Sequence, residues 1–266
     1  MAIILGVFMA LTGCFITSLA YGAPKAPDKE PPKNLAPKIA LPETALVGEV
    51  TLKLVGPNGL ERVDGIDPTA DKFLDSLKER FKLRVLAVYS DPTEFKRFSA
   101  DLANQRPSPI PRMALISVPT RMDKKSYDEK AVKKEISRYR EWFSFAVNTR
   151  PIAWLMGRKA NSRLKSKLGL DTHFSYLTGP ETKRFDLRDL SVSFSVLPSM
   201  ELYGAKSDFF VAASMLSVPD KLVFLSWIEP SQAVSALNET RAKVIVWLFN
   251  MAKANGVTLA APASED

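Results

Sequence analysis

The sequence predicts an α/β protein of the α+β type, in which an antiparallel or mixed central sheet is flanked by helices as an α/β/α sandwich. Between residues 50 and 147, short strand-like runs alternate with segments whose apolar residues recur at helical spacing. From residue 173 the apolar period changes to two over four consecutive runs, and one long helical pattern closes the chain.

The first elements are a strand, a turn and a helix. Residues 50–54 alternate apolar with polar side chains, which is typical of a half-buried strand, and the glycines of residues 56–59 favour a turn. Asp67 and Pro68 have the residue types of a helix N-cap and a first helical position. Apolar residues on one stripe then predict a helix that reaches Phe81.

A second strand and helix follow directly. Residues 83–89 predict a strand, and its end leads into Asp91, Pro92 and Glu94, which have the spacing of a capping box with proline at the first helical position. The helix that begins there carries the apolar residues Phe95, Phe98 and Leu102.

The middle of the chain predicts one strand and two helical stretches. Residues 113–118 form a strand-like run that Pro119 ends, and Ser126 with Glu129 has the spacing of another capping box. The helix after this box has its apolar positions at Val132, Ile136, Tyr139, Phe143 and Val147. A further helical stretch is predicted from Pro151 to residue 168.

The second half of the chain predicts consecutive strands and a closing helix. The strands are expected over residues 173–178, 190–197, 209–218 and 221–228. Pro219 and Asp220 suit a tight turn, so the last two strands are expected to pair as an antiparallel hairpin. The helix is expected from about residue 231 to Asn255, where Gly256 provides a C-terminal stop. Its inward positions are Val234, Leu237, Val244, Ile245, Leu248 and Met251.

The N-terminal residues have the features of an export signal. Residues 1–22 contain no charged side chain and are predicted to be a signal peptide, with a linker rich in proline and lysine over residues 23–45. Small residues precede possible cuts between Tyr21 and Pro24, so the mature chain is expected to begin there. The predicted location is periplasmic or secreted. Residues 46–256 are expected to form a single domain, and residues 257–266 a loose tail.

Two alternatives to a cleaved signal remain open. An apolar run of about 20 residues is long enough to cross a bilayer, so residues 2–21 are a candidate for an uncleaved membrane anchor. Residues 11–14, Leu-Thr-Gly-Cys, are similar to a bacterial lipobox, which would make Cys14 a lipidated N-terminus. However, the apolar run continues past Cys14 to Ala20, where lipoproteins usually become polar.

The composition narrows the classes of function. The chain has 37 lysines and arginines against 29 aspartates and glutamates, which gives a net charge of +8. In an exported protein this charge favours an anionic envelope component, a membrane surface or an acidic protein partner over nucleic acid. The alternative is a lysine-rich surface that serves solubility alone. Cys14 is the only cysteine, so the domain beyond the leader forms no disulfide and must be held by its core.

The sequence contains no recognisable catalytic motif. The single histidine, His173, follows Asp171 by two residues, and such a pair can orient an imidazole for base catalysis. No nucleophile motif accompanies it, and a surface hydrogen bond explains the same spacing. One histidine excludes paired-histidine zinc motifs, and no phosphate-binding glycine loop is present. We therefore predict no catalytic residue, no metal site and no cofactor.

The most unusual local composition lies between Glu141 and Asp171. Apolar and aromatic residues, including Trp154, are interleaved there with cations, as in amphipathic segments that lie on anionic surfaces. Alternatively, the segment is a solvated helix whose apolar side packs on the sheet. Both interpretations can be true together if the apolar side of the segment packs on the sheet and the cations face a partner. The predicted partner-binding residues are Arg150, Arg158, Lys159, Arg163, Lys165 and Lys167.

Four segments of the second half have a familiar core pattern: SVSFS at 191–195, AASML at 212–216, SVPDKLVFL at 217–225, and VWL with a closing AN within 246–255. Together they resemble the C-terminal half of PsbP-like domains and their uncharacterised bacterial relatives. The resemblance covers about half of the domain. It implies an α/β/α sandwich that is usually non-enzymatic and often an accessory or assembly factor on a membrane-facing side. It implies no functional residues.

These features lead us to expect an exported, non-enzymatic accessory domain that binds a macromolecule or an anionic envelope component through a basic face. The alternative is a hydrolase or transferase whose Ser, Asp or Glu residues converge only in three dimensions. A pocket lined by convergent polar groups would favour the enzyme, whereas a flat basic face would favour binding.

Overall fold

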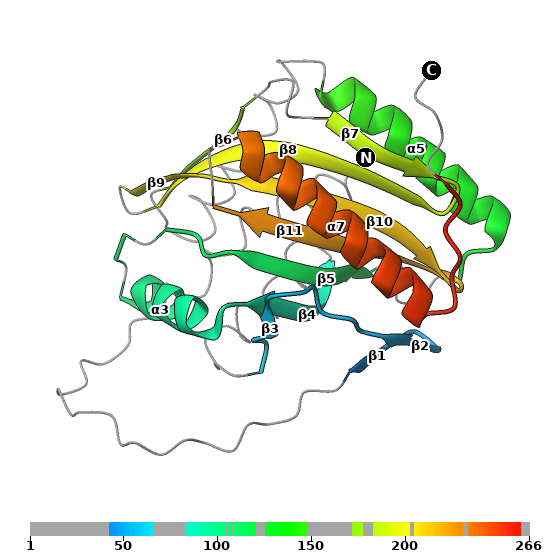
Figure 1. The fold of residues 1–266 in the computed structure, drawn as a ribbon, viewed down its shortest axis with the longest axis horizontal. Helices are drawn as coiled ribbons and strands as arrows, with labels where there is room; N and C mark the ends of the chain where they lie inside the picture. The colour runs from blue at the N-terminus through cyan, green and yellow to red at the C-terminus, as the bar shows by residue number, and fades with distance from the viewer. Residues whose placement is uncertain are drawn as a thin grey trace.

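A computed structural model describes residues 43–65, 83–104, 106–107, 109–120, 126–147, 172–177, 183–202, 205–230 and 234–261 (Figure 1). Its large sheet contains β3 (Glu61–Arg62), β4 (Leu83–Ser90), β5 (Met113–Pro119), β6 (Thr172–Leu177), β7 (Lys183–Arg188), β8 (Ser191–Leu202), β9 (Ala205–Asp208), β10 (Phe210–Val218) and β11 (Lys221–Glu229). A separate hairpin consists of β1 (Thr44–Val47) and β2 (Val50–Lys53). The helices of the described residues are α3 (Pro92–Ala103), α5 (Glu129–Val147) and α7 (Val234–Ala254).

The large sheet is antiparallel at every described strand pair, in the order β3-β4-β5-β11-β10-β8-β6. The first half of the long strand β8 pairs with β7 and β10, and its second half pairs with β6 and β9. The predicted α+β class, with a sheet of antiparallel strands and accompanying helices, is therefore confirmed.

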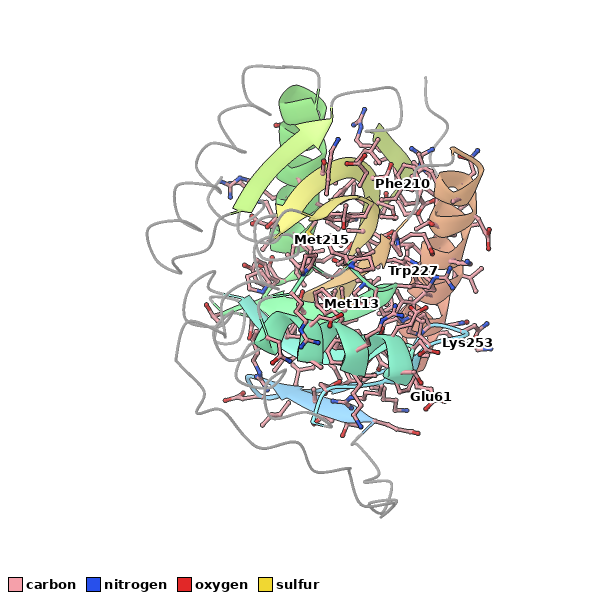
Figure 2. All side chains as sticks on the ribbon, turned by 90° about the vertical axis from the view of Figure 1, so that its left-hand side faces the viewer. Glu61, Met113, Phe210, Met215, Trp227 and Lys253 are labelled. Atoms are coloured by element: carbon pink, nitrogen blue, oxygen red, sulfur yellow. The ribbon has the colours of Figure 1, made fainter. Side chains whose placement is uncertain are left out.

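Helices α7 and α5 lie on opposite sides of this sheet (Figure 2). On one side, Leu225 and Trp227 of β11 belong to the same buried cluster as Leu248 of α7. On the other side, the ring of Phe224 meets Tyr139 of α5 edge to face, with 5.8 Å between the ring centroids. Because successive side chains of a strand point to opposite faces, both faces of β11 are buried.

The predicted hairpin is present between β10 and β11. The two strands pair from Phe210 with Glu229 to Val218 with Lys221, and every residue of both strands is buried. Asp220 occupies the third turn position with a φ of 60°, which is the left-handed conformation that a type II turn requires there. Aspartate tolerates this conformation better than most residues, and Pro219 presets the position before it.

Of the two predicted helix N-caps, Asp91 is confirmed and Ser126 is wrong. The Asp91 carboxylate accepts hydrogen bonds from the backbone N–H groups of Thr93 and Glu94, both at 2.9 Å, so Asp91 caps α3. At α5 the cap is Asp128, whose carboxylate accepts from the Ala131 N–H at 2.7 Å. Ser126 lies outside this helix, because Asp128 stands at the position directly before its first residue.

The closing helix is confirmed as part of the core. Leu237, Val244, Leu248 and Met251 are each no more than 1% exposed. After α7, Gly256 adopts a φ of 72°, and the Val257 N–H donates to the Ala252 carbonyl at 2.9 Å. A glycine in this conformation is the common way to end a helix, as the sequence predicted.

The structure corrects two predicted boundaries. Strand β1 begins at Thr44, so the last residues assigned to the linker lie in a β-hairpin. The segment after α7 is not loose throughout, because Val257 and Leu259 pack against the core and the Ala260 carbonyl accepts a hydrogen bond from Arg188. The leader, the linker up to residue 42, the predicted helix at 67–81 and the helical stretch at 151–168 lie outside the described residues.

Candidate functional site

The six predicted partner-binding residues, Arg150, Arg158, Lys159, Arg163, Lys165 and Lys167, lie outside the described residues. Their contribution to the charge of the chain follows from the sequence. Residues 142–170, which we call the basic segment, contain these six cations and no acidic residue. Residues 1–42 add a net charge of +2. The remaining residues, 43–141 and 171–266, contain 27 lysines and arginines against 27 aspartates and glutamates, and we call them the neutral body.

Many charges of the neutral body are paired with one another. The described ion pairs are Arg62–Asp64, Arg112–Glu229, Lys133–Glu129, Arg138–Glu135, Arg188–Asp186, Lys206–Asp208 and Lys243–Glu239. Several are exposed, so each contributes little to stability. Their effect on the surface potential is larger, because a paired charge presents almost no net field to an approaching partner.

The only histidine is held in an edge region of the sheet. His173 lies in β6, where it pairs with Glu201 of β8, and Asp171 lies outside the described residues. Among the residues that the structure describes, no group of three or more His, Cys, Asp or Glu side chains could hold a metal ion.

A cleft opens at one end of the sheet, with a volume of about 470 Å³. Its walls come from the start of α5, the β7–β8 turn, the β10–β11 turn and the segment after α7. These four parts meet at the end where β10 finishes, on the right of Figure 1. Because it contains the turn of the β10–β11 hairpin, we call it the hairpin-end cleft.

One ion pair lies on the rim of this cleft. The Lys133 ammonium contacts the Glu129 carboxylate at 2.8 Å across one helical turn of α5. This hydrogen bond raises the pKa of Lys133, with a further electrostatic contribution from Glu129 and a small one from Asp189, and it lowers the pKa of Glu129. Both side chains are exposed, so the pair is a weak contact that keeps both groups charged.

Two carboxylates of the cleft form no side-chain hydrogen bond or ion pair of this kind, although Asp189 interacts electrostatically with Lys133. The carboxylates of Asp189 and Asp220 form no hydrogen bond and no ion pair among the described residues, although the Asp220 backbone carbonyl accepts from the Tyr127 N–H at 3.1 Å. Ser217 is only 7% exposed, and its N–H donates to the Leu190 carbonyl at 2.8 Å.

A second, smaller pocket of about 260 Å³ lies beside α7. Trp227 and Trp247 line it, with Lys243 and Glu239 among the other lining residues. The indole N–H of Trp247 donates to the Val55 carbonyl at 2.6 Å, and that of Trp227 donates to Glu229 at 3.1 Å. Both indoles are almost fully buried and already have their hydrogen-bond partners, so this pocket is mainly a feature of the core.

The edges of this aromatic region are close-packed. Tyr89 meets Trp247 edge to face at 6.4 Å, and a Cβ atom on Gly56 would lie 2.6 Å from the Tyr89 ring. Burial raises the pKa of Tyr89 to about 12, which the nearby Arg62 partly offsets. Tyr89 is therefore held as the neutral phenol through the physiological range.

A row of buried polar groups lies on the α7 side of β7, β8 and β10. Ser193 and Ser214 share a hydrogen bond of 2.6 Å, and Ser195 accepts from Arg241 of α7 at 2.8 Å. Asp186 and Arg188 of β7 form a buried ion pair at 2.9 Å. The guanidinium of Arg188 also lies 4.6 Å from the ring centroid of Phe249. These groups mostly satisfy one another, so the row attaches α7 and the C-terminal segment to the sheet.

The hairpin-end cleft was not predicted from the sequence. Its polar residues are distributed over four segments that are far apart along the chain, and each one alone is typical of a turn or a helix start. The predicted Pro219–Asp220 turn was the one available signal, since it placed a carboxylate at the end of a hairpin.

Comparison with known proteins found no matching family model, no similar curated protein and no similar solved structure. Among the described helices, none combines the length and the apolar character that a membrane span needs.

Proposed function

We propose that this chain is an exported, non-enzymatic accessory domain of PsbP-like fold, which binds an anionic envelope component or an acidic protein through the basic segment. The observation that carries the proposal is the distribution of charge. The neutral body sums to zero, and the basic segment alone supplies six of the eight net positive charges. A surface that uses lysine for solubility alone would spread this excess over the chain.

The electrostatic argument also sets the range of the interaction. Exposed charges attract over about 8–10 Å at physiological ionic strength, so only a densely charged partner surface can engage several of these cations together. Each lysine or arginine that lies close to an anionic membrane surface contributes about 1 kcal/mol to binding. The interleaved aromatic and aliphatic residues of the basic segment, such as Trp154 and Leu164, are suited to add apolar contact.

The export part of the proposal rests on residues 1–22, and the fold part on the sheet with α5 and α7 on its two sides.

If the protein is exported with a cleaved signal, the chain isolated from its native source should begin between Tyr21 and Pro24. Mass spectrometry of the N-terminus measures this directly. A lipid on Cys14, or an intact Met1 in the membrane fraction, would show instead that the protein is tethered to the membrane.

Binding is tested by sedimentation of the purified protein with vesicles that contain about 30% phosphatidylglycerol. We expect binding at low salt that weakens steeply as the salt concentration rises. Replacement of Arg158, Lys159, Arg163 and Lys165 by Gln should remove most of the bound fraction. The matched control replaces Lys96, Arg97, Lys130 and Lys134 by Gln, which are exposed residues of the neutral body and change the net charge equally.

The control variant distinguishes the effect of the position of the cations from the effect of the net charge of the protein. If both variants lose binding equally, total charge and not the basic segment determines the interaction. If the basic-segment variant binds as the wild type does, with circular dichroism showing that it is folded, the proposed binding site is wrong.

A further inference from the structure

We propose that the protein forms a twofold symmetric dimer, in which the exposed face of helix α7 packs antiparallel against the same face of a second copy. This proposal goes beyond the function proposed above and does not depend on it, because it concerns α7 and not the basic segment.

The outer face of α7 carries exposed apolar side chains. The helix lies outermost on its side of the sheet (Figure 1, Figure 2). Three large apolar residues are exposed among the described residues, and two of them, Val246 at 52% and Phe249 at 39%, lie on this helix. The ring of Phe249 is supported from one side by the guanidinium of Arg188, which lies 4.6 Å from the ring centroid. The apolar surface is therefore a fixed feature of the helix.

These side chains belong to one stripe along the helix. Because an α-helix turns by about 100° per residue, positions that are three, four or seven residues apart lie on the same face. The exposed residues at this spacing, which we call the α7 stripe, are Glu239, Ala242, Val246, Phe249, Asn250 and Lys253. The stripe is mainly apolar in its middle, and its two ends have opposite charges.

The charges of the α7 stripe are complementary to those of a second, antiparallel copy. Glu239 lies seven residues before Val246, and Lys253 lies seven residues after it. A twofold axis at Val246 therefore places Glu239 of each copy at the same height as Lys253 of the other copy, about 10.5 Å from the axis. Parallel helices in register would place like charges opposite each other instead. The charge pattern thus selects the antiparallel arrangement.

The sizes of the apolar side chains fit the same arrangement. Phe249 and Ala242 are rotated by about 60° and 40° to the same side of Val246. The twofold axis keeps equal sides of the two helices together, so Phe249 of each copy lies beside Ala242 of the other. A large side chain opposite a small one lets two helices pack at the usual axial distance of about 8–10 Å.

Glu239 can contact the second copy without losing its present partner. Its carboxylate contacts the Lys243 ammonium at 2.7 Å, and its side chain is still 66% exposed. A carboxylate has two oxygens and accepts hydrogen bonds from more than one donor. The pocket of about 260 Å³ beside α7 is lined in part by Ala242, Val246 and Asn250, so a second copy on the stripe would also cover this pocket.

A protein surface fits the α7 stripe better than a lipid surface does. Helices that lie on membranes usually have lysine and arginine along the polar border of their apolar face. The stripe has one acid and one cation, which balance each other. The surface that matches this alternation of charge, apolar centre and opposite charge is the stripe itself.

Sedimentation velocity of the purified protein from about 5 to 500 µM provides the first test. We expect the mean mass to rise from that of the monomer towards that of the dimer. Val246→Glu places two carboxylates against each other on the twofold axis, and it should weaken the dimer by about 10-fold or more. Val246 is exposed, so the variant should remain folded, which circular dichroism checks.

A charge exchange tests the antiparallel register. Glu239→Lys should weaken the dimer by roughly 2- to 30-fold, because two exposed ion pairs are lost by symmetry. Adding Lys253→Glu to this variant restores opposite charges and the original net charge, and the dimer should recover to within about 3-fold. The matched control is Glu141→Lys, which makes the same change of charge at an exposed position of α5, on the other side of the sheet. Its dimer should be as strong as that of the wild type.

Disulfide formation tests the position of the axis. In a Cys14→Ser background, Val246→Cys should form a covalent dimer on mild oxidation, because a residue on the axis meets its own copy. Ala242→Cys is the control on the same stripe. Its two copies would lie about 12 Å apart along the helices, and a disulfide needs Cα atoms within about 7 Å, so it should form little covalent dimer.

The proposal is overturned if the wild type stays monomeric up to about 500 µM, or if Val246→Glu dimerises as the wild type does. It is also overturned if the charge exchange fails to restore what Glu239→Lys removes, or if Ala242→Cys crosslinks as well as Val246→Cys. Binding of the monomeric wild type to neutral phosphatidylcholine vesicles, lost in Val246→Glu, would assign the stripe to a membrane instead. Vesicle binding by the basic segment is measured separately, so the two proposals fail separately.

Discussion

The neutral body and the basic segment use their charges in opposite ways. In the neutral body, cations and acids are equal in number and many are paired, some of them inside the fold, as with Asp186 and Arg188. In the basic segment six cations occur without an acid. Buried pairs of the first kind hold elements together, whereas we expect charges of the second kind to be available to a partner. Substitutions in the two regions should therefore change different properties.

The largest effect is expected from the buried ion pair of the neutral body. Asp186→Ala leaves Arg188 buried without its carboxylate, and we expect the free energy of unfolding to fall by about 3–5 kcal/mol. Urea denaturation measures this change. The double variant Asp186→Ala with Arg188→Met should lose less, because it removes the unpaired charge. Equal losses would mean that the pair does not act as a unit.

Shortening a buried side chain of the closing helix should also destabilise the fold. Leu248 is fully buried against the sheet, so Leu248→Ala should lower the free energy of unfolding by about 2–5 kcal/mol. Asn250→Ala, at an exposed position of the same helix, should change it by no more than about 0.5 kcal/mol. A loss below that value for Leu248→Ala would contradict the assigned core. Folded molecules of either variant should bind vesicles as the wild type does.

Alkaline pH should weaken the aromatic part of the core. Burial raises the pKa of Tyr89 from 10.0 to about 12, so the folded state keeps this proton at pH values where the unfolded state releases it. This contribution to stability is complete below pH 10 and is lost as the pH rises towards 12. It amounts to about 2–3 kcal/mol. Urea denaturation of the wild type and of Tyr89→Phe from pH 9 to 12 isolates it, since the variant lacks this group. Parallel stability curves would show that Tyr89 titrates normally.

The smallest of these effects concerns the start of α5. Asp128→Ala removes the observed helix cap and should cost about 1 kcal/mol, whereas Ser126→Ala should cost nearly nothing. Thermal or chemical denaturation distinguishes the two variants. A larger loss of stability for Ser126→Ala than for Asp128→Ala would support the capping box that the sequence alone predicts.

Much of the fold followed from local patterns. The hairpin of β10 and β11 was predictable because long apolar runs meet at Pro219 and Asp220, and the cap of α3 because Asp91 precedes a proline. Strand β7 was not predicted, since it contains Lys183, Arg184, Asp186 and Arg188. Asp186 and Arg188 are buried because they pair with each other and Arg188 also contacts the segment after α7, which hydrophobic periodicity does not detect.

The sites were less predictable than the fold. The N-cap of α5 was misplaced because Ser126 and Asp128 are both good capping residues, and only the position of the first helical turn distinguishes them. The hairpin-end cleft could not be predicted because it needs the three-dimensional approach of Asp189, Ser217 and the segment after α7. The basic segment, in contrast, is a contiguous feature of the sequence and was found without a structure.

The central claim is that the basic segment and not the neutral body attaches the protein to its anionic partner. The most direct measurement is the fraction of protein that sediments with isolated cell envelopes, at low salt and after a wash at high salt. We predict that the wild type and the variant with Lys96, Arg97, Lys130 and Lys134 replaced by Gln sediment at low salt and are released at high salt. The variant with Arg158, Lys159, Arg163 and Lys165 replaced by Gln should stay in the supernatant at both salt concentrations. Sedimentation of that folded variant together with the wild type would contradict the account.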